Sequence, residues 1–176
     1  MIQRGHGSMS DALTRSDPTP STPFVGHGVT ISLALPMARY SLRARSPQAL
    51  ETLLDVKVPK KIGATHSGIA CLGPDEWLMR APTGTKIPMA EGLAMAITDV
   101  SERSVCLIVE GAAAARLLMT GCPQDLALFA VGKASRTIYE TVEIIIIRET
   151  EDKFHVEVWP SFAPWLWTAL TMAANH

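Results

Sequence analysis

The residues of this chain that could do chemistry are few, and none lies in a recognised catalytic pattern. Glu143 lies in a very apolar segment, where burial would raise the pKa of its carboxyl group. The alternative is a strand-edge position that faces water. Cys122 follows the expected end of a helix, where the helix dipole disfavours a thiolate, so we interpret it as a small residue in a tight loop. The sequence therefore predicts no catalytic residue.

Motifs that bind cofactors and metals are also missing from the sequence. Gly26-x-Gly28 approaches the dinucleotide-binding pattern but lacks its third glycine, and it lies in a polar stretch that we interpret as a loop. Metal ligands in proteins usually come in close pairs, and no such pair occurs among the histidines and cysteines. These residues are His6, His27, His66, His155, His176, Cys71, Cys106 and Cys122. We therefore expect this chain alone to bind neither a flavin, a nicotinamide cofactor nor a metal.

Composition excludes several classes of protein. Of the 176 residues, 47% are hydrophobic and 19% are charged, which suits a globular domain with an ordinary core. The formal net charge of -1 argues against a nucleic-acid partner. No apolar run is long enough to cross a bilayer, and the N-terminus has no pattern typical of a signal peptide. We therefore expect a cytoplasmic protein with no membrane partner.

The chain divides into a polar leader and one domain. Residues 1–28 contain a stretch rich in proline, serine and threonine, which predicts a flexible leader. Met1 or Met9 could be the natural start. Residues 29–176 are predicted to form a single domain.

Periodicity predicts the elements of that domain. Ser46 and Pro47 are typical of a helix start, and a weaker helix is expected over residues 88–95. Another helix is expected after Gly111, and a last one is expected to be capped by Ser161. Strands are expected at residues 29–35, 37–43, 68–72, 76–81, 97–100, 104–109, 134–139, 142–148 and 153–159. Short connections between strands leave little room for parallel crossovers. The fold class is therefore α+β, a mostly antiparallel sheet with helices packed on one face.

Aromatic residues are concentrated near the C-terminus. Phe162 and Trp165 share the apolar stripe of the last predicted helix, whereas Trp159 and Trp167 lie outside it. Either a large core covers these two tryptophans, or they form a contact surface for another chain. Trp77, Trp159 and Trp167 are the candidate partner-contact residues.

Five segments, in order, resemble the gamma subunits of heterotetrameric sarcosine oxidases. They are Leu72-Gly73-Pro74-Asp75-Glu76-Trp77-Leu78, Asp99-Val100-Ser101-x-Arg103-Ser104, Gly121-Cys122-Pro123-x-Asp125-Leu126, Val131-Gly132-x-Ala134-x-Arg136-Thr137, and Glu157-Val158-Trp159-x-Ser161-Phe162-Ala163-Pro164-x-Leu166-Trp167. Two departures stand out: Glu102 and Pro160 occupy positions where the family often has basic residues. The segment around Glu143 also lacks the glycines and paired acids of the aminomethyltransferases' catalytic segment.

The resemblance implies a fold, partners and a role. The fold is that of the folate-binding domain of glycine-cleavage aminomethyltransferases. The partners are a large alpha subunit and a flavin-carrying beta subunit, with FAD, FMN, NAD and tetrahydrofolate on those subunits. The chain would then be a non-flavin accessory subunit of a complex that demethylates sarcosine or a related N-methyl amino acid.

A second hypothesis is a stand-alone protein that binds folate or another small ligand. It predicts an apolar pocket in which polar groups converge, with Arg103, Arg136 and Glu143 as candidate ligand-binding residues. The accessory-subunit hypothesis instead predicts an exposed apolar surface for a partner.

Overall fold

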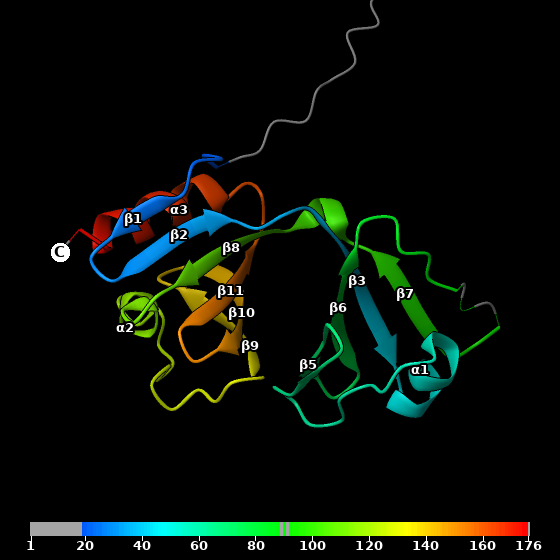
Figure 1. Cartoon of the computed structure of the whole chain (residues 1–176). Coiled ribbons are helices and arrows are strands. Elements are labelled where there is room, and N and C mark those ends of the chain that lie inside the picture. Colours follow the sequence, from blue (N-terminus) through cyan, green and yellow to red (C-terminus); the bar gives the residue numbers. More distant parts are fainter. Residues whose placement is uncertain (1–18, 89, 91, 176) are drawn as a thin grey trace, which may run out of the picture.

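The computed structural model describes residues 19–88, 90 and 92–175, and these residues form two antiparallel sheets with three α-helices (Figure 1). The strands are β1 (Phe24–Gly26), β2 (Val29–Leu33), β3 (Met37–Ala44), β4 (Thr65–His66), β5 (Ile69–Gly73), β6 (Glu76–Pro82), β7 (Met95–Asp99), β8 (Val105–Glu110), β9 (Ala134–Tyr139), β10 (Val142–Thr150) and β11 (Lys153–Val158). The helices are α1 (Pro47–Leu54), α2 (Ala114–Leu118) and α3 (Ala163–Ala173), with a 3-10 turn η1 at Ser101–Arg103.

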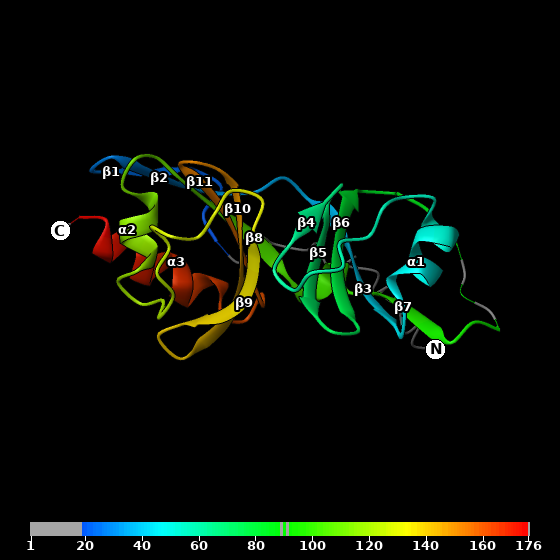
Figure 2. The ribbon, with the colours of Figure 1, turned by 90° about the horizontal axis from the view of Figure 1, so that it is seen from below.

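The five-stranded sheet is inserted into the six-stranded one. The six-stranded sheet has the order β1-β2-β8-β11-β10-β9, and the five-stranded sheet has the order β4-β5-β6-β3-β7. The chain leaves the first sheet after β2 and returns through η1 to β8, which pairs with β2. The two sheets therefore lie side by side, with β2 and β8 leading into the junction between them (Figures 1 and 2).

Both faces of the six-stranded sheet are covered. The four successive isoleucines of β10 alternate: Ile144 and Ile146 join the core under α2 and α3, whereas Ile145 and Ile147 face a small cluster with Ala70 of β5. An apolar run buried on both sides has this pattern. The predicted double burial of residues 144–147 is confirmed.

The five-stranded sheet has a core of its own. Leu42, Leu50, Ile69 and Trp77 are buried together there, beneath α1 (Figure 2). The helix begins as predicted, because the Ser46 hydroxyl accepts a hydrogen bond from the backbone N–H of Gln48 at 3.2 Å. Two cores thus lie within the range predicted as one domain.

Several predicted elements differ from the structure. Residues 24–26 form β1, so the leader predicted over residues 1–28 extends too far; its residues 1–18 lie outside the described part. The prediction of a helix over residues 88–95 is wrong for the described residues of this range, because Gly92 has a positive φ of 69° and Met95 begins β7. Ser161 does not cap α3; Phe162 occupies the N-cap without a side-chain hydrogen bond.

The α+β class is confirmed, since every strand pair is antiparallel in the described residues. No helix found in this part of the chain has the length and apolar character needed to cross a membrane.

Candidate functional site

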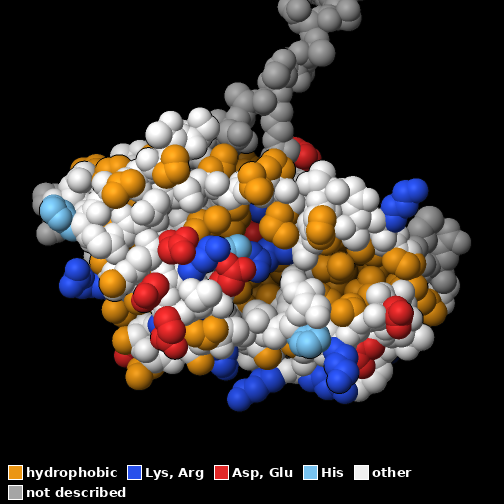
Figure 3. Space-filling view, in the orientation of Figure 1, with side chains coloured by type: hydrophobic (Ala, Val, Ile, Leu, Met, Phe, Trp, Pro, Cys, Tyr) orange, Lys and Arg blue, Asp and Glu red, His pale blue; other side chains and the backbone are white. Residues whose placement is uncertain are grey.

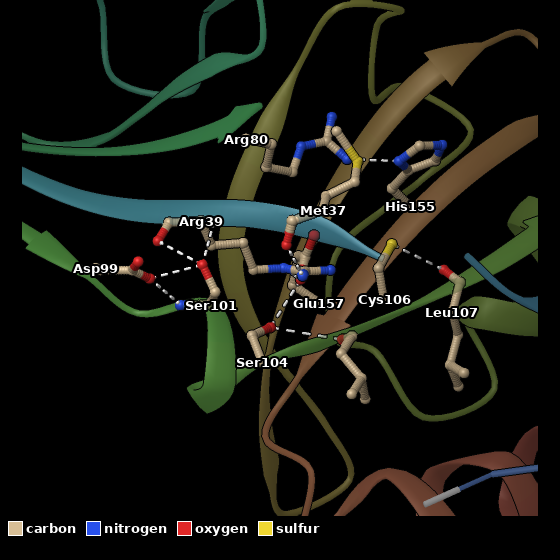
Figure 4. A network of polar contacts seen from close by, with 11 residues as sticks. Met37, Arg39, Arg80, Asp99, Ser101, Ser104, Cys106, Leu107, His155 and Glu157 are labelled. Carbon is tan, nitrogen blue, oxygen red and sulfur yellow. Dashed lines mark hydrogen bonds and ion pairs between the residues drawn. The ribbon is translucent and has the colours of Figure 1, made fainter. Parts of the chain in front are cut away.

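A buried ion pair joins the two sheets at their centre. Arg39 of β3 donates from Nε to Oε2 of Glu157 on β11 at 2.7 Å, and the two side chains are only 5% and 2% exposed (Figure 4). Ser104 Oγ donates to the same carboxylate oxygen at 2.7 Å. Arg39 also donates to the carbonyl oxygen of Met37 at 3.0 Å. The geometry therefore holds the ends of β3, β8 and β11 in one network.

A second contact between the sheets is made by a histidine. Arg80 Nη1 of β6 donates to Nδ1 of His155 on β11, so Nδ1 must be the accepting nitrogen (Figure 4). The ring proton is then on Nε2, which lies 2.9 Å from Oε2 of Glu149. Burial, and next the positive charge of Arg80, lower the pKa of His155. His155 is therefore held as the neutral tautomer between a cation and an anion.

A third contact is a two-pronged ion pair at the edge of the junction. Both terminal nitrogens of Arg136 on β9 donate to the carboxylate of Glu76 on β6, Nη1 at 3.1 Å. The hydrogen bond from Arg136 is the main cause of the lowered pKa of Glu76. Figure 3 shows acidic, basic and histidine side chains gathered in a hollow near the centre of one face, where the sheets meet.

Glu157, Ser104 and the Arg136–Glu76 pair border a cavity of about 200 Å³ that has walls from both sheets, whereas Arg80 and His155 do not line it. All three predicted ligand-binding residues, Arg103, Arg136 and Glu143, line it, although they come from η1, β9 and β10. Glu143 has a side chain that is 58% exposed, so the water-facing alternative describes it. Among the residues that the structure describes, no cysteine, histidine or tyrosine lines the cavity. Its charged groups, the guanidinium of Arg103 and the carboxylate of Glu143 among them, can pair with charged groups of a ligand.

The three tryptophans predicted to contact a partner differ in exposure. Trp159 is 49% exposed, and the guanidinium carbon of Arg103 lies 5.4 Å from the centre of its ring. Trp77 is buried in the core of the five-stranded sheet, where its ring nitrogen donates to the carbonyl oxygen of Pro59 at 2.7 Å. Trp167 is buried under the six-stranded sheet. The expectation is therefore corrected for Trp77 and Trp167, which are core residues of this chain.

Comparison with known proteins gives a consistent family. The profile of a family described as "Sarcosine oxidase, gamma subunit family" matches residues 37–176. This chain belongs to that family. The curated sarcosine oxidase subunit gamma of an Arthrobacter species is 28% identical to this chain, over 61% of this chain and 59% of the relative. The subunit gamma of Corynebacterium sp. (strain P-1) is 26% identical, over 73% of this chain and 71% of the relative. The chain thus spans about three fifths of the first relative's length.

Solved structures agree with the gamma-family assignment. A chain of the heterotetrameric sarcosine oxidase from Corynebacterium sp. U-96, in complex with pyrrole 2-carboxylate, superposes with a TM-score of 0.73 at 26% identity, covering 83% of each chain. The glycine cleavage system aminomethyltransferase T from Bartonella henselae gives 0.65 at 16% identity, covering 82% of this chain and 46% of that one. The second likeness shows the fold alone, which is the predicted aminomethyltransferase-like fold.

Segments that resemble the gamma family meet in space. Glu76, from the first segment, is the partner of Arg136 from the fourth, and Ser104, from the second, donates to Glu157 from the fifth. The third segment begins at Gly121, where a side chain would lie 2.7 Å from the ring of Tyr139. Four of the five resembling segments thus meet at the junction between the sheets, whereas the third packs into the core of the six-stranded sheet.

The sequence did not predict the buried ion pair and the buried histidine contact between the sheets. Arg39 and Arg80 lie on strands that alternate only loosely, and nothing in the sequence distinguishes them from exposed arginines. His155 and Glu157 share the polar face of β11, which normally indicates contact with water. That face is buried here, because the five-stranded sheet covers it. The one available signal was the polar face of β11, because this strand lies between two apolar strands, β8 and β10.

Proposed function

We propose that this chain is an accessory subunit, without flavin, of a sarcosine-oxidase-like complex that oxidatively demethylates sarcosine or a related N-methyl amino acid. The observation that carries the proposal is the match, over most of both chains, with a chain of a heterotetrameric sarcosine oxidase. The family assignment agrees with it. The cavity of this chain offers arginines and carboxylates, whereas oxidation of an amine requires a redox cofactor.

The partners in this proposal are an alpha subunit and a flavin-carrying beta subunit. FAD, FMN, NAD and tetrahydrofolate would be bound by those subunits, and the assembly would be cytoplasmic. The substrate would then react on a partner, and this chain would stabilise or complete the complex.

An exposed aromatic surface supports a partner role. Trp159, Phe162 and Trp165 lie close together in the chain, at the turn from β11 into α3, and are 49%, 46% and 38% exposed. Arg103 lies over the Trp159 ring. Tryptophan and arginine contribute more than other residues to the centres of protein interfaces. We propose this aromatic surface, defined by Trp159, Phe162, Trp165 and Arg103, as the contact with a larger subunit.

The alternative, a stand-alone folate-binding protein, has less support. Its predicted polar residues do converge on one cavity, but the volume of about 200 Å³ is below the range of roughly 300–1,000 Å³ typical of sites for larger ligands. Arg136 is also engaged by Glu76. The likeness to the aminomethyltransferase concerns the fold and carries no activity.

An affinity purification tests the assembly. The full chain, tagged and expressed in its source organism, should copurify with two larger proteins, identified by peptide mass spectrometry, and with the yellow absorbance of flavin. The double variant Trp159→Ala/Phe162→Ala should lose most of the copurifying protein. Leu128→Ala, which removes an even more exposed apolar side chain elsewhere, should behave as the wild type. Recovery of the wild-type chain alone and colourless would contradict the proposal.

A further inference from the structure

A second apolar stripe runs along helix α3, on a side that the six-stranded sheet does not cover. The buried side of the helix, which includes Leu166 and Leu170, packs into the core of that sheet (Figure 2). The second stripe, here called the α3 stripe, is exposed or half-buried and consists of Phe162, Trp165, Ala169 and Met172. Exposed sides of helices are normally polar, so an apolar stripe of this length indicates a surface that another molecule covers.

Helix α3 presents no charge to whatever covers it. No residue of Ala163–Ala173 is charged, whereas α1 and α2 each contain a charged residue. The hydroxyl of Thr168 donates to the carbonyl oxygen of Pro164 at 3.0 Å, and the hydroxyl of Thr171 donates to the carbonyl oxygen of Thr168 at 3.0 Å. Both hydroxyl protons are therefore used within the helix. A charged surface placed against α3 would lose its water without gaining a counter-charge, so the complementary surface is apolar and uncharged.

The spacing of the α3 stripe indicates which kind of element covers it. Its four residues follow one another at intervals of three, four and three positions, which is the alternation of the a and d positions in a coiled-coil seam. Side chains at this spacing pack between those of a second helix that runs nearly along the first. None of the four residues lines the cavity at the sheet junction, so the α3 stripe is a separate surface.

The α3 stripe is continuous with the aromatic surface. Phe162 and Trp165 belong to both. The ring of Tyr139 meets the Trp165 ring edge-on, with ring centres 6.3 Å apart and planes at 69°. This contact holds the Trp165 ring in one orientation, as is favourable for a residue at the centre of an interface. A partner that covers the aromatic surface therefore has an uninterrupted apolar path along α3.

We propose that an α-helix of a larger subunit packs along α3, with an apolar and uncharged side of its own against the α3 stripe. Ala169 is the small residue of the stripe, and it lets the two helices approach closely at the middle of the contact. The aromatic side chains of Phe162 and Trp165 lie at one end and Met172 at the other. This inference rests on the proposed assembly and adds the type of partner element that α3 receives.

Photo-crosslinking within the copurified assembly tests the type of partner element. The photoreactive residue p-benzoylphenylalanine replaces Phe162 in one tagged full chain and Met172 in another, and peptide mass spectrometry locates the crosslinked residues. Each position should crosslink to residues of a larger subunit that are three or four apart in sequence. Ten residues of α3 span about 15 Å, so the two positions should reach points roughly ten residues apart in the same segment. Crosslinks to a second copy of this chain, to unrelated segments, or to no larger subunit would overturn the proposal.

A matched pair of variants tests the apolar character of the contact. Met172→Glu places a carboxylate in the α3 stripe at a position that is 62% exposed in this chain, so the fold should tolerate it. Recovery of the larger subunits should fall about tenfold or more, because the partner helix would bury that charge without a counter-charge. Thr52→Glu adds the same charge at an exposed position of α1 and should copurify as the wild type does. Urea midpoints check that both variants are folded.

The outcomes separate this inference from the proposed function. If the wild type brings down the flavin-carrying proteins but Met172→Glu does so equally well, or if both variants lose them equally, the helix contact is refuted and the accessory role stands. If the wild-type chain is recovered alone, both are refuted.

Discussion

Replacing Arg39 with methionine removes the cation of the buried pair while keeping a long apolar side chain. Glu157 then remains 2% exposed with Ser104 as its remaining hydrogen-bond donor. Removing one member of a buried ion pair typically costs about 3–5 kcal/mol, because the other charge stays buried without compensation. The 2.7 Å distance and the exposures of 5% and 2% place this pair in that class. We therefore expect Arg39→Met to lower the free energy of unfolding by about 3–5 kcal/mol.

Two comparison variants separate this cost from general damage. The double variant Arg39→Met/Glu157→Leu removes both charges and should recover most of the lost stability, because the desolvation cost of the carboxylate disappears with it. Arg43→Met breaks a pair with Asp75 that is 51% and 60% exposed and a longer pair with Glu76 at 3.4 Å. It should cost no more than about 1 kcal/mol, because Arg43 is exposed and Glu76 keeps Arg136 as its partner.

Urea denaturation followed by tryptophan fluorescence measures all of these free energies by linear extrapolation. The reasoning is refuted if Arg39→Met costs no more than Arg43→Met. It is also refuted if the double variant is less stable than Arg39→Met, since the buried carboxylate would then not be the source of the loss.

Three other predictions concern the same junction. The pKa of Glu76 is lowered below 4.5 mainly by Arg136, so this pair stabilises the folded chain above that pH and the contribution is lost as the pH falls. The difference in unfolding free energy between wild type and Arg136→Gln should therefore shrink in acid. A difference that stays constant with pH would count against this prediction. The pKa of His155 is lowered below 6.5, mainly by burial, so the unfolded chain binds the proton more tightly. The stability of the folded chain should therefore fall as the pH drops below that value. An NMR titration of the imidazole with a midpoint at or above 6.5 would disprove this. Gly121→Ala places a methyl group against the Tyr139 ring and should cost about 1–3 kcal/mol in urea denaturation, and an unchanged midpoint would show that the ring moves freely.

Sequence patterns correctly predicted those elements whose formation depends on neighbouring residues in the chain. Ser46 caps α1, and the isoleucines of β10 are buried on both sides, as their types and order indicate. The last helix begins without the expected serine cap. The segment before β7 turns at Gly92, so a weak helical periodicity there was overridden by backbone conformation. Short amphipathic runs do not determine a helix unless a core covers their apolar side.

Only some residues of the candidate site could be predicted from the sequence. Arg103 and Arg136 were singled out as possible ligand contacts, and they line one cavity because the folded sheets bring η1 and β9 together. Arg39 and Glu157 could not be paired in advance, because their contact joins strands of different sheets that are far apart in the sequence. Trp77 was mistaken for a surface residue, although its indole ring fills a core and its N–H is satisfied by a backbone carbonyl. Burial of polar and aromatic groups depends on tertiary contacts that periodicity does not encode.

Native mass spectrometry of the material that copurifies with the tagged chain tests the central claim most directly, because it weighs each intact assembly and its bound cofactors. The account predicts a particle that contains this chain together with two larger subunits, with flavin mass retained by the larger subunits and none by this chain after mild dissociation. A particle of this chain alone, or flavin that remains with this chain after dissociation, would contradict the accessory role.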